Sequence, residues 1–184
     1  MSAERVKGKL LVAMPTLQDP NFMRTVVFMI EHNDEGALGV ILNRPVELFA
    51  GELLDRWSDV LGSASLAEGG PVSTDSAVCL ARPRAVAPSE ETTVVIDGVV
   101  AVNLDADPAI VAAYIDEPRV FIGYAGWGTG QLEAEIAEGG WIVTETSNLD
   151  VFDPDPSTLW TRVMLRQPGK LKLLATFPAD PKMN

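Results

Sequence analysis

The sequence predicts a single α+β domain in which helices flank a mixed, largely antiparallel sheet; whether that sheet closes toward a barrel stays open. Three observations lead to this class. The 184 residues are the length of one ordinary domain. Apolar residues fall in short runs rich in β-branched side chains, and turn residues separate these runs. Strands and helices then follow one another without the regular alternation of a parallel βαβ fold.

The N-terminal part of the chain is predicted to be mostly strand. Residues 1–8 are polar and are expected to form a flexible extension, and an apolar strand at 10–14 ends near a proline. Two β-branched runs, 25–31 and 38–43, flank a polar connection that contains a glycine, which predicts a hairpin. Residues 51–57 place leucines and a tryptophan at helical spacing, so a helix is expected there.

The remainder mixes strands with short helices inside the same domain, residues 1–184. Asp107 and Asp155 each precede a proline, and a capping aspartate before proline is a typical helix start. Asp97 and Gly98 predict a two-residue hairpin turn. Residues 178–184 are expected to form a tail. The predicted strands are 76–81, 92–96, 99–102, 120–125 and 141–144, and the predicted helices are 107–114, 131–138 and 155–165.

The charge is strongly negative and unevenly distributed. Against 14 lysines and arginines stand 26 aspartates and glutamates, which gives a net charge of −12. Residues 85–161 hold 14 of these acids and one base, Arg119. A duplex-binding surface needs clustered cations to displace counterions from phosphates, so no direct binding of nucleic acid is expected.

The scarcity of cysteine and histidine limits the chemistry. One cysteine, Cys79, excludes an internal disulfide, and with one histidine it cannot supply the four ligands of a structural zinc site. Cys79 lies in an apolar run and is predicted to be a buried, inert thiol. No apolar run approaches the ~18 residues that span a bilayer, and no signal-peptide pattern opens the chain, so no membrane association is expected.

Several segments together carry a family resemblance. The chain resembles the AlgH/YqgE family of bacterial proteins, and the match extends over roughly residues 10–165. The resemblance implies one compact domain around a sheet and a cytoplasmic location, and one branch of the family is labelled as a transcriptional regulator. No catalytic residue is carried over with it. The matching segments are residues 11–27, Glu31-His32-Asn33, residues 36–39, Asn43-Arg44-Pro45, Gly69-Gly70-Pro71-Val72, Gly123-Tyr124-Ala125-Gly126-Trp127, Gly130-Gln131-Leu132-Glu133 and Trp141.

Four residues of the early segments are candidates for binding a ligand or partner: Asp19, Arg24, His32 and Asn43. His32 could serve as a general base if the fold placed Asp19, Asn43 or Glu31 beside it as an orienting group. The structural alternative is a histidine bonded to its own turn or to a facing strand. Asp19 and Arg24 could bind a ligand, or they could pair with each other and fix their loop.

Two further candidates, Trp127 and Gln131, belong to a glycine-rich turn that follows a predicted strand and opens a helix. Backbone N–H groups at such a turn can bind an anion. A phosphate-binding lysine and the third glycine of a dinucleotide motif are both missing. The favoured interpretation is a tight turn that packs Trp127 on the sheet, with Thr129 as the helix cap. A small-ligand pocket is the alternative.

The residues favour binding over catalysis, and no catalytic residue, metal site or cofactor is predicted. Asp150, Asp153 and Asp155 could suggest a cation site, but the neighbouring prolines favour capping and turn formation. The leading hypothesis is an accessory or regulatory protein that binds an unidentified partner protein or small ligand. One alternative is a transcriptional regulator that acts indirectly; another is a hydrolase or transferase that uses His32 and nearby carboxylates.

Overall fold

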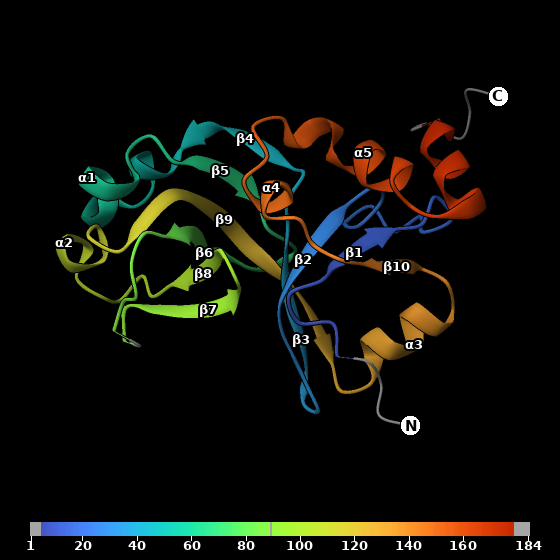
Figure 1. The fold of residues 1–184 in the computed structure, drawn as a ribbon, viewed down its shortest axis with the longest axis horizontal. Coiled ribbons are helices and arrows are strands. Elements are labelled where there is room, and N and C mark those ends of the chain that lie inside the picture. Colours follow the sequence, from blue (N-terminus) through green and yellow to red (C-terminus); the bar gives the residue numbers. More distant parts are fainter. Residues whose placement is uncertain (1–4, 89, 179–184) are drawn as a thin grey trace.

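The computed structural model describes residues 5–88 and 90–178. Within them the chain forms one compact α+β domain whose sheet curls into a half-barrel flanked by helices, which confirms the predicted class (Figure 1). The strands are β1 (Leu10–Ala13), β2 (Val26–Asn33), β3 (Gly36–Ile41), β4 (Pro45–Phe49), β5 (Ser65–Glu68), β6 (Val72–Pro83), β7 (Thr92–Ile96), β8 (Val99–Val102), β9 (Ile115–Gly128) and β10 (Trp141–Thr144).

The helices are short and lie around the sheet. The α-helices are α1 (Ser58–Leu61), α2 (Pro108–Val111), α3 (Gln131–Ala137), α4 (Asn148–Val151) and α5 (Leu159–Leu165). The 3-10 turns are η1 (Ala50–Glu52), η2 (Asp55–Trp57), η3 (Pro156–Thr158) and η4 (Gly169–Thr176). In Figure 1, α5 and η4 lie above one end of the sheet and α3 lies below it.

The long strand β9 joins the two halves of the sheet. The strand order is β10-β1-β2-β3-β9-β6-β8-β7, and β4 is added through β5, which lies beside β9. Residues 125–128 of β9 pair with β3, whereas residues 119–122 pair with β5. The β5–β9 pair is parallel and the other pairs are antiparallel, so the predicted mixed, largely antiparallel sheet is confirmed.

Where the neighbour of β9 changes from β5 to β3, three glycines allow two backbone segments to approach each other closely. Gly69 accepts a hydrogen bond from Ile41 N–H (2.8 Å) and donates one to the carbonyl of Ile122 (2.7 Å). A Cβ on Gly70 would lie 2.2 Å from the carbonyl of Tyr124, and a Cβ on Gly123 would lie 2.5 Å from the oxygen of Gly70. Gly123 also has φ +67°, which side chains rarely adopt. The glycines in two of the family segments therefore have a structural reason.

The predicted last helix packs as expected on one face of the sheet. The indole N–H of Trp160 donates to the carbonyl of Ala13 (2.9 Å), which fixes α5 to the end of β1. The four residues of its predicted apolar stripe are buried: Leu159, Trp160, Val163 and Met164.

The prediction of one continuous helix at 51–57 is wrong. The chain makes the two turns η1 and η2, and α1 follows them. Leu54 has φ −116° and ψ 72°, so the helical path is interrupted between the turns. Consequently Leu53 is 52% exposed while Trp57 is buried, and the two do not share a face.

Five elements were not predicted: β4, β5, α1, α4 and η4. Most side chains of β4 are exposed, so it lacks the alternation that marks a half-buried strand, and β5 has only four residues. Helix α4 begins with a capping box in which Ser147 and Asp150 bond each other's backbone N–H groups. The strand β9 also continues through Trp127 to Gly128, beyond the predicted end at 125.

The N-terminal segment expected to be a flexible extension, residues 1–8, lies partly outside the described residues, which begin at residue 5. Val6 is 2% exposed and its N–H donates to His32. Gly8 N–H donates to the carbonyl of Met29 (2.7 Å). Residues 5–8 are thus packed along β2. Of the predicted tail, residues 179–184 lie outside the described residues.

Replacing Asp107 with alanine tests the predicted cap of α2. The Asp107 carboxylate accepts a hydrogen bond from Ala109 N–H (2.9 Å), and Pro108 opens the helix. Loss of the cap should lower the free energy of unfolding by about 1 kcal/mol. Urea denaturation measures the change, with Asp105→Ala as the control because its carboxylate does not cap the helix. Equal midpoints for Asp107→Ala and the wild type would contradict the cap's contribution.

Candidate functional site

Of the six candidate residues, His32 and Trp127 lie at one end of the β2–β3 hairpin, and Arg24 and Asn43 lie at the other, although Phe22 of the early loop stacks on the Trp127 ring. His32, Ala37 and Trp127 are neighbours in one row across β2, β3 and β9. Arg24 precedes β2 and Asn43 follows β3, so both lie at the other end. The six or so residues between the ends span about 20 Å of strand. The candidates therefore do not form one cleft.

His32 is buried and bonded through both ring nitrogens. Its Nδ1 accepts from Val6 N–H (3.0 Å), and its Nε2 lies 2.9 Å from Oε1 of Glu133 on α3. Because Nδ1 accepts a hydrogen bond, the ring proton belongs on Nε2, which donates to Glu133. A general base needs a nitrogen that can reach a substrate proton. His32 instead ties the N-terminal segment and α3 to the sheet.

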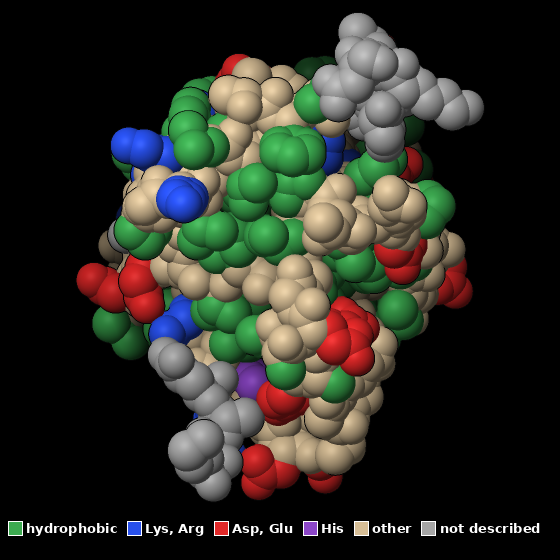
Figure 2. Space-filling model, turned by 90° about the vertical axis from the view of Figure 1, so that its right-hand side faces the viewer, with side chains coloured by type: hydrophobic (Ala, Val, Ile, Leu, Met, Phe, Trp, Pro, Cys, Tyr) green, Lys and Arg blue, Asp and Glu red, His purple; other side chains and the backbone are tan. Residues whose placement is uncertain are grey.

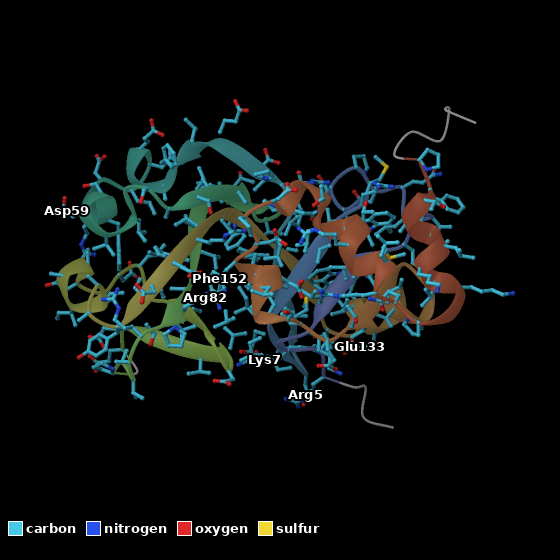
Figure 3. The ribbon with its side chains drawn as sticks, turned by 45° about the horizontal axis from the view of Figure 1, so that its top comes forward. Arg5, Lys7, Asp59, Arg82, Glu133 and Phe152 are labelled. Carbon is cyan, nitrogen blue, oxygen red and sulfur yellow. The ribbon has the colours of Figure 1, made fainter. Side chains whose placement is uncertain are left out.

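The surroundings of this histidine are charged on the surface. Lys7 pairs with Glu31 (3.4 Å) and Arg5 with Asp34 (3.3 Å), at the end of the molecule where Figure 3 labels Arg5, Lys7 and Glu133. The carboxylate of Glu133 accepts hydrogen bonds from the backbone N–H of Glu133 and from His32. Both bonds lower the pKa of this carboxylate below its usual value, and the backbone bond has the larger effect. These contacts hold the N-terminal segment against β2 and α3.

Trp127 is a core residue whose polar atom is satisfied. It is 5% exposed and stacks on Phe22 at 6.0 Å between ring centroids, with Trp141 edge-on at the same distance. The indole N–H groups of both tryptophans donate to one carboxylate oxygen of Glu135, each at 2.9 Å. Gln131 donates to the other oxygen (3.0 Å). This arrangement agrees with the favoured packing interpretation.

The expected cap of α3 is wrong. The residue at the helix start is Gly130, with φ +72° and no side-chain cap, because the turn needs a left-handed residue at that position. The hydroxyl of Thr129 donates to the carbonyl of Glu35 on the neighbouring hairpin (3.1 Å). Gln131 accepts from Gly128 N–H (3.1 Å) and so closes the turn.

Asp19, Arg24 and Asn43 shape the early loop. Asp19 closes a turn by accepting from Asn21 N–H (2.8 Å). Asn43 accepts from Val26 N–H (2.8 Å) and donates to the carbonyl of Arg24 (2.9 Å), which joins the ends of the hairpin. Arg24 lies over the Trp160 ring, 4.0 Å from its centroid. The suggested Asp19–Arg24 pair is not formed.

The three aspartates weighed as a cation site serve local structure, as expected. The predicted cap by Asp155 is wrong, because its carboxylate makes no capping bond and accepts from the hydroxyls of Ser157 and Thr158. The carboxylate of Asp150 caps α4 and forms a bidentate ion pair with Arg166. Asp153 accepts from Asp155 N–H (2.8 Å), and Asp155 accepts from the hydroxyl of Ser157 (2.6 Å). Among the described residues, no group of three or more metal-ligating side chains is arranged to hold an ion.

Cys79 is a buried thiol on β6, as predicted. It is 1% exposed, and burial raises its pKa to about 12. A thiol reacts through its thiolate, so iodoacetamide at pH 8 should leave the native protein unmodified and alkylate it fully in urea. Intact-mass spectrometry follows the reaction. Rapid alkylation of the native protein would contradict the burial of Cys79.

A pocket of about 290 Å³ lies where three of the family segments meet. It adjoins the glycine contacts described above, and we call it the junction pocket. Asn21 belongs to the segment 11–27, and Arg44 belongs to the segment 43–45, which follows β3. Gly70 and Pro71 belong to the segment 69–72. The residues that line it are Asn21, Ile41, Arg44, Glu68, Gly70, Pro71, Thr74 and Ile122.

Two opposite charges line this pocket without pairing. Arg44 donates to the carbonyl of Pro20 (3.0 Å), and Glu68 N–H donates to the carbonyl of Arg44 (2.9 Å). Within the described chain, neither the guanidinium of Arg44 nor the carboxylate of Glu68 forms an ion pair. Sequence reasoning missed Arg44, Glu68 and Thr74 as site residues. Arg44 belongs to one of the segments that resemble the AlgH/YqgE family, whereas Glu68 and Thr74 lie outside those segments and in no recognisable motif.

The fold and these segments define an AlgH-like protein, and the chain belongs to that family: the AlgH-like family profile matches residues 10–172. A UPF0301 protein of Streptomyces coelicolor is 44% identical over 182 residues, which cover 96% of this chain and 94% of the relative. One from Thermobifida fusca is 47% identical over 188 residues, with the same coverage.

Two solved structures have the same fold over nearly the whole chain. A protein of Corynebacterium diphtheriae superimposes with a TM-score of 0.84 at 31% identity, covering 96% of this chain and 95% of its own. The AlgH protein of Pseudomonas aeruginosa gives a TM-score of 0.72 at 31% identity, covering 97% of each chain. The resemblance noted from the sequence is therefore confirmed.

Proposed function

We propose that this AlgH-like protein is a non-catalytic accessory protein that binds a small zwitterionic ligand in the junction pocket. One observation carries the proposal: three segments of the family resemblance, distant in sequence, supply the walls of one pocket. Its volume of about 290 Å³ is near the lower end for small-molecule sites and suits a ligand of amino-acid size.

The charges of the pocket favour the zwitterion. Arg44 can bind a carboxylate through its guanidinium, and Glu68 can accept hydrogen bonds from an ammonium group. Because neither charge is used in an ion pair, a ligand would not need to break one. Ile41, Pro71 and Ile122 add apolar surface for the ligand's carbon atoms.

The test is a thermal-shift and calorimetric comparison against the twenty L-amino acids and a set of dipeptides. We expect at least one of them to stabilise the wild type, and Arg44→Met to abolish the shift while leaving the basal melting temperature nearly unchanged. Arg56→Met is the matched control, because Arg56 is an exposed arginine that donates to the carbonyl of Asp105, away from the pocket. No stabilisation by any compound, or equal shifts in Arg44→Met, would overturn the proposal.

Catalysis by His32 finds no support in this geometry, because both of its nitrogens bond structural partners. We propose that any regulatory effect is exerted through the ligand or a partner protein in the cytoplasm. In the described chain no helix is long and apolar enough to cross a membrane.

The basic residues support an indirect role in any regulation of transcription. On the face shown in Figure 2, the lysines and arginines form no continuous patch, and acidic side chains occur on the same face. Arg82 also lies over the ring of Phe152, 4.3 Å from its centroid (Figure 3). The ion pairs of the described residues include Arg5–Asp34, Lys7–Glu31, Lys9–Glu145, Arg82–Glu117, Arg84–Asp116, Arg162–Asp153 and Arg166–Asp150.

A mobility-shift assay with random duplex DNA tests this directly. We expect no retarded band at about 10 μM protein and physiological salt, since paired cations and a charge of −12 leave little surface that attracts phosphate. A basic duplex-binding protein serves as the positive control. Micromolar binding that weakens steeply with salt would contradict the expectation.

A further inference from the structure

Strand β7 ends the sheet order, with β8 on one side and no described strand on the other (Figure 1). An edge strand presents backbone donors and acceptors that another strand can pair with. Lysine and proline, which commonly protect such edges, are absent from Thr92–Ile96. The free side of β7 is therefore chemically suited to a further strand.

The hydrogen-bond pattern identifies the backbone groups on that free side. Asn103 N–H donates to the carbonyl of Glu91 (2.8 Å), so these opposed residues form a bonded pair. Bonded and unbonded pairs alternate along an antiparallel ladder. The pair three steps further, Val94 and Val100, is therefore unbonded. Val94 N–H and C=O point away from β8, toward the open edge.

An apolar groove lies beside the same strand. It has a volume of about 590 Å³ and runs between the β7–β8 hairpin and the segment at residues 83–87. Val94 on β7 is 65% exposed and Val86 on the facing segment is 97% exposed. Ile96 and Val100 add further apolar surface. Outward backbone groups and a side-chain groove thus occur together, which is the combination that binds extended peptides.

The edge strand β4, which pairs with β5 alone, lacks this combination. Its register shifts between Val46 and Phe49, within a strand of five residues, whereas the shift in β7, between Val94 and Ile96, leaves residues 92–94 in regular pairing. Phe49 N–H is already bonded to the carboxylate of Glu52 (2.8 Å). Leu48 is 46% exposed, so β4 offers an apolar side chain without the open ladder. It therefore supplies a control for the β7 edge.

Charge decides what pairs with β7. A second copy paired antiparallel about Val94 would set Glu91 against Asp97 of the other chain, and like charges directly opposed are destabilising. Glu90, Glu91 and Asp97 at the ends of β7 are acidic, and Arg84, the base that lines the groove, is paired with Asp116. A partner strand with basic residues at its ends would instead meet opposite charges.

We propose that β7 and the neighbouring groove bind an extended segment of a partner protein, which adds a strand to the sheet. The segment has apolar side chains at alternate positions, to fill the groove beside Val94 and Ile96, and lysine or arginine at its ends. This surface is separate from the junction pocket, and its test does not depend on that pocket's ligand.

The probe is a fluorescein-labelled ten-residue peptide with the sequence KKTVTVTVKK, titrated with the whole protein and followed by anisotropy. We expect saturable binding, weakened at least about tenfold when glutamate replaces the four lysines of the peptide; a tenfold change equals about 1.4 kcal/mol. Binding should also weaken when salt is added, because Glu90 and Asp97, at the two ends of β7, are exposed.

Two substitutions at one position separate the backbone from the side chain. Val94→Pro removes the outward N–H, which the β8 ladder does not use, and proline is tolerated on such edges. Val94→Asp keeps that N–H and places a negative charge in the exposed groove. Both variants should weaken binding at least about tenfold. If Val94→Pro has a lower melting temperature than the wild type, the binding of Val94→Asp is the result that counts.

The controls are Leu48→Asp on β4 and Arg44→Met in the junction pocket, and both should bind the peptide as the wild type does. No saturable binding up to about 1 mM peptide, or binding by both Val94 variants as tight as that of the wild type, would overturn the proposal. A dimer in sedimentation that both Val94 variants dissociate would also overturn it, since the second copy would then be the occupant.

Discussion

Gly70→Ala should leave little folded protein. Its Cβ would lie 2.2 Å from the carbonyl of Tyr124, within the backbone of β9, and its φ of +155° strains any side chain. Overpacking and an unfavourable φ together should cost about 4 kcal/mol or more, a large part of the stability of a domain. Gly123→Ala should behave in the same way, since its Cβ would meet the oxygen of Gly70. Urea denaturation and soluble yield measure both effects.

Gly128→Ala is the matched control. Gly128 lies at the end of the same strand, and nothing lies within 4 Å of the Cβ it would gain. We expect its midpoint to stay within about 0.5 kcal/mol of the wild type. If Gly70→Ala unfolded at the same urea concentration as Gly128→Ala, the close backbone approach at the junction would be wrong.

The second large effect is expected at Trp127. Trp127→Ala should destabilise the protein by about 3–5 kcal/mol, because it removes a buried ring that packs on Phe22 and Trp141. It also removes one of the donors to Glu135. Thermal and urea unfolding give the size of the loss.

Trp127→Phe separates packing from hydrogen bonding. Phenylalanine keeps an aromatic ring in the cluster but has no N–H, while Trp141 and Gln131 still donate to Glu135. We expect a much smaller loss than for alanine, with the missing hydrogen bond contributing about 1 kcal/mol. A Trp127→Ala protein as stable as the wild type would refute the core assignment.

Local patterns were sufficient for much of the fold. The β2–β3 hairpin, the Asp97-Gly98 turn and the buried stripe of α5 follow from residues close in sequence, and the structure contains each. Strand β4 gives no periodic signal because its stability comes from pairing with β5. Local spacing likewise suggested one helix at 51–57, where the backbone at Leu54 interrupts the helical path.

The candidate site depended on distant contacts and was harder to predict. His32 stood out as the one imidazole, but its partners are Val6 and Glu133, 26 and 101 residues away, and they make it structural. Arg44 and Gly70 do belong to segments that carry the family resemblance. They lie with Glu68 around one pocket because β3 and β5 both pair with β9. No short sequence pattern specifies that pairing.

Backbone-amide chemical shifts of labelled protein report whether the junction pocket binds a zwitterionic ligand. With the best stabilising amino acid or dipeptide added, the amides of Asn21, Glu68, Gly70 and Thr74 should shift and saturate together. Those of Thr129 and Gly130, in the turn before α3, should not move. Shifts confined to residues outside the junction pocket, or no saturable shift with any of these compounds, would show that the pocket does not bind such a ligand.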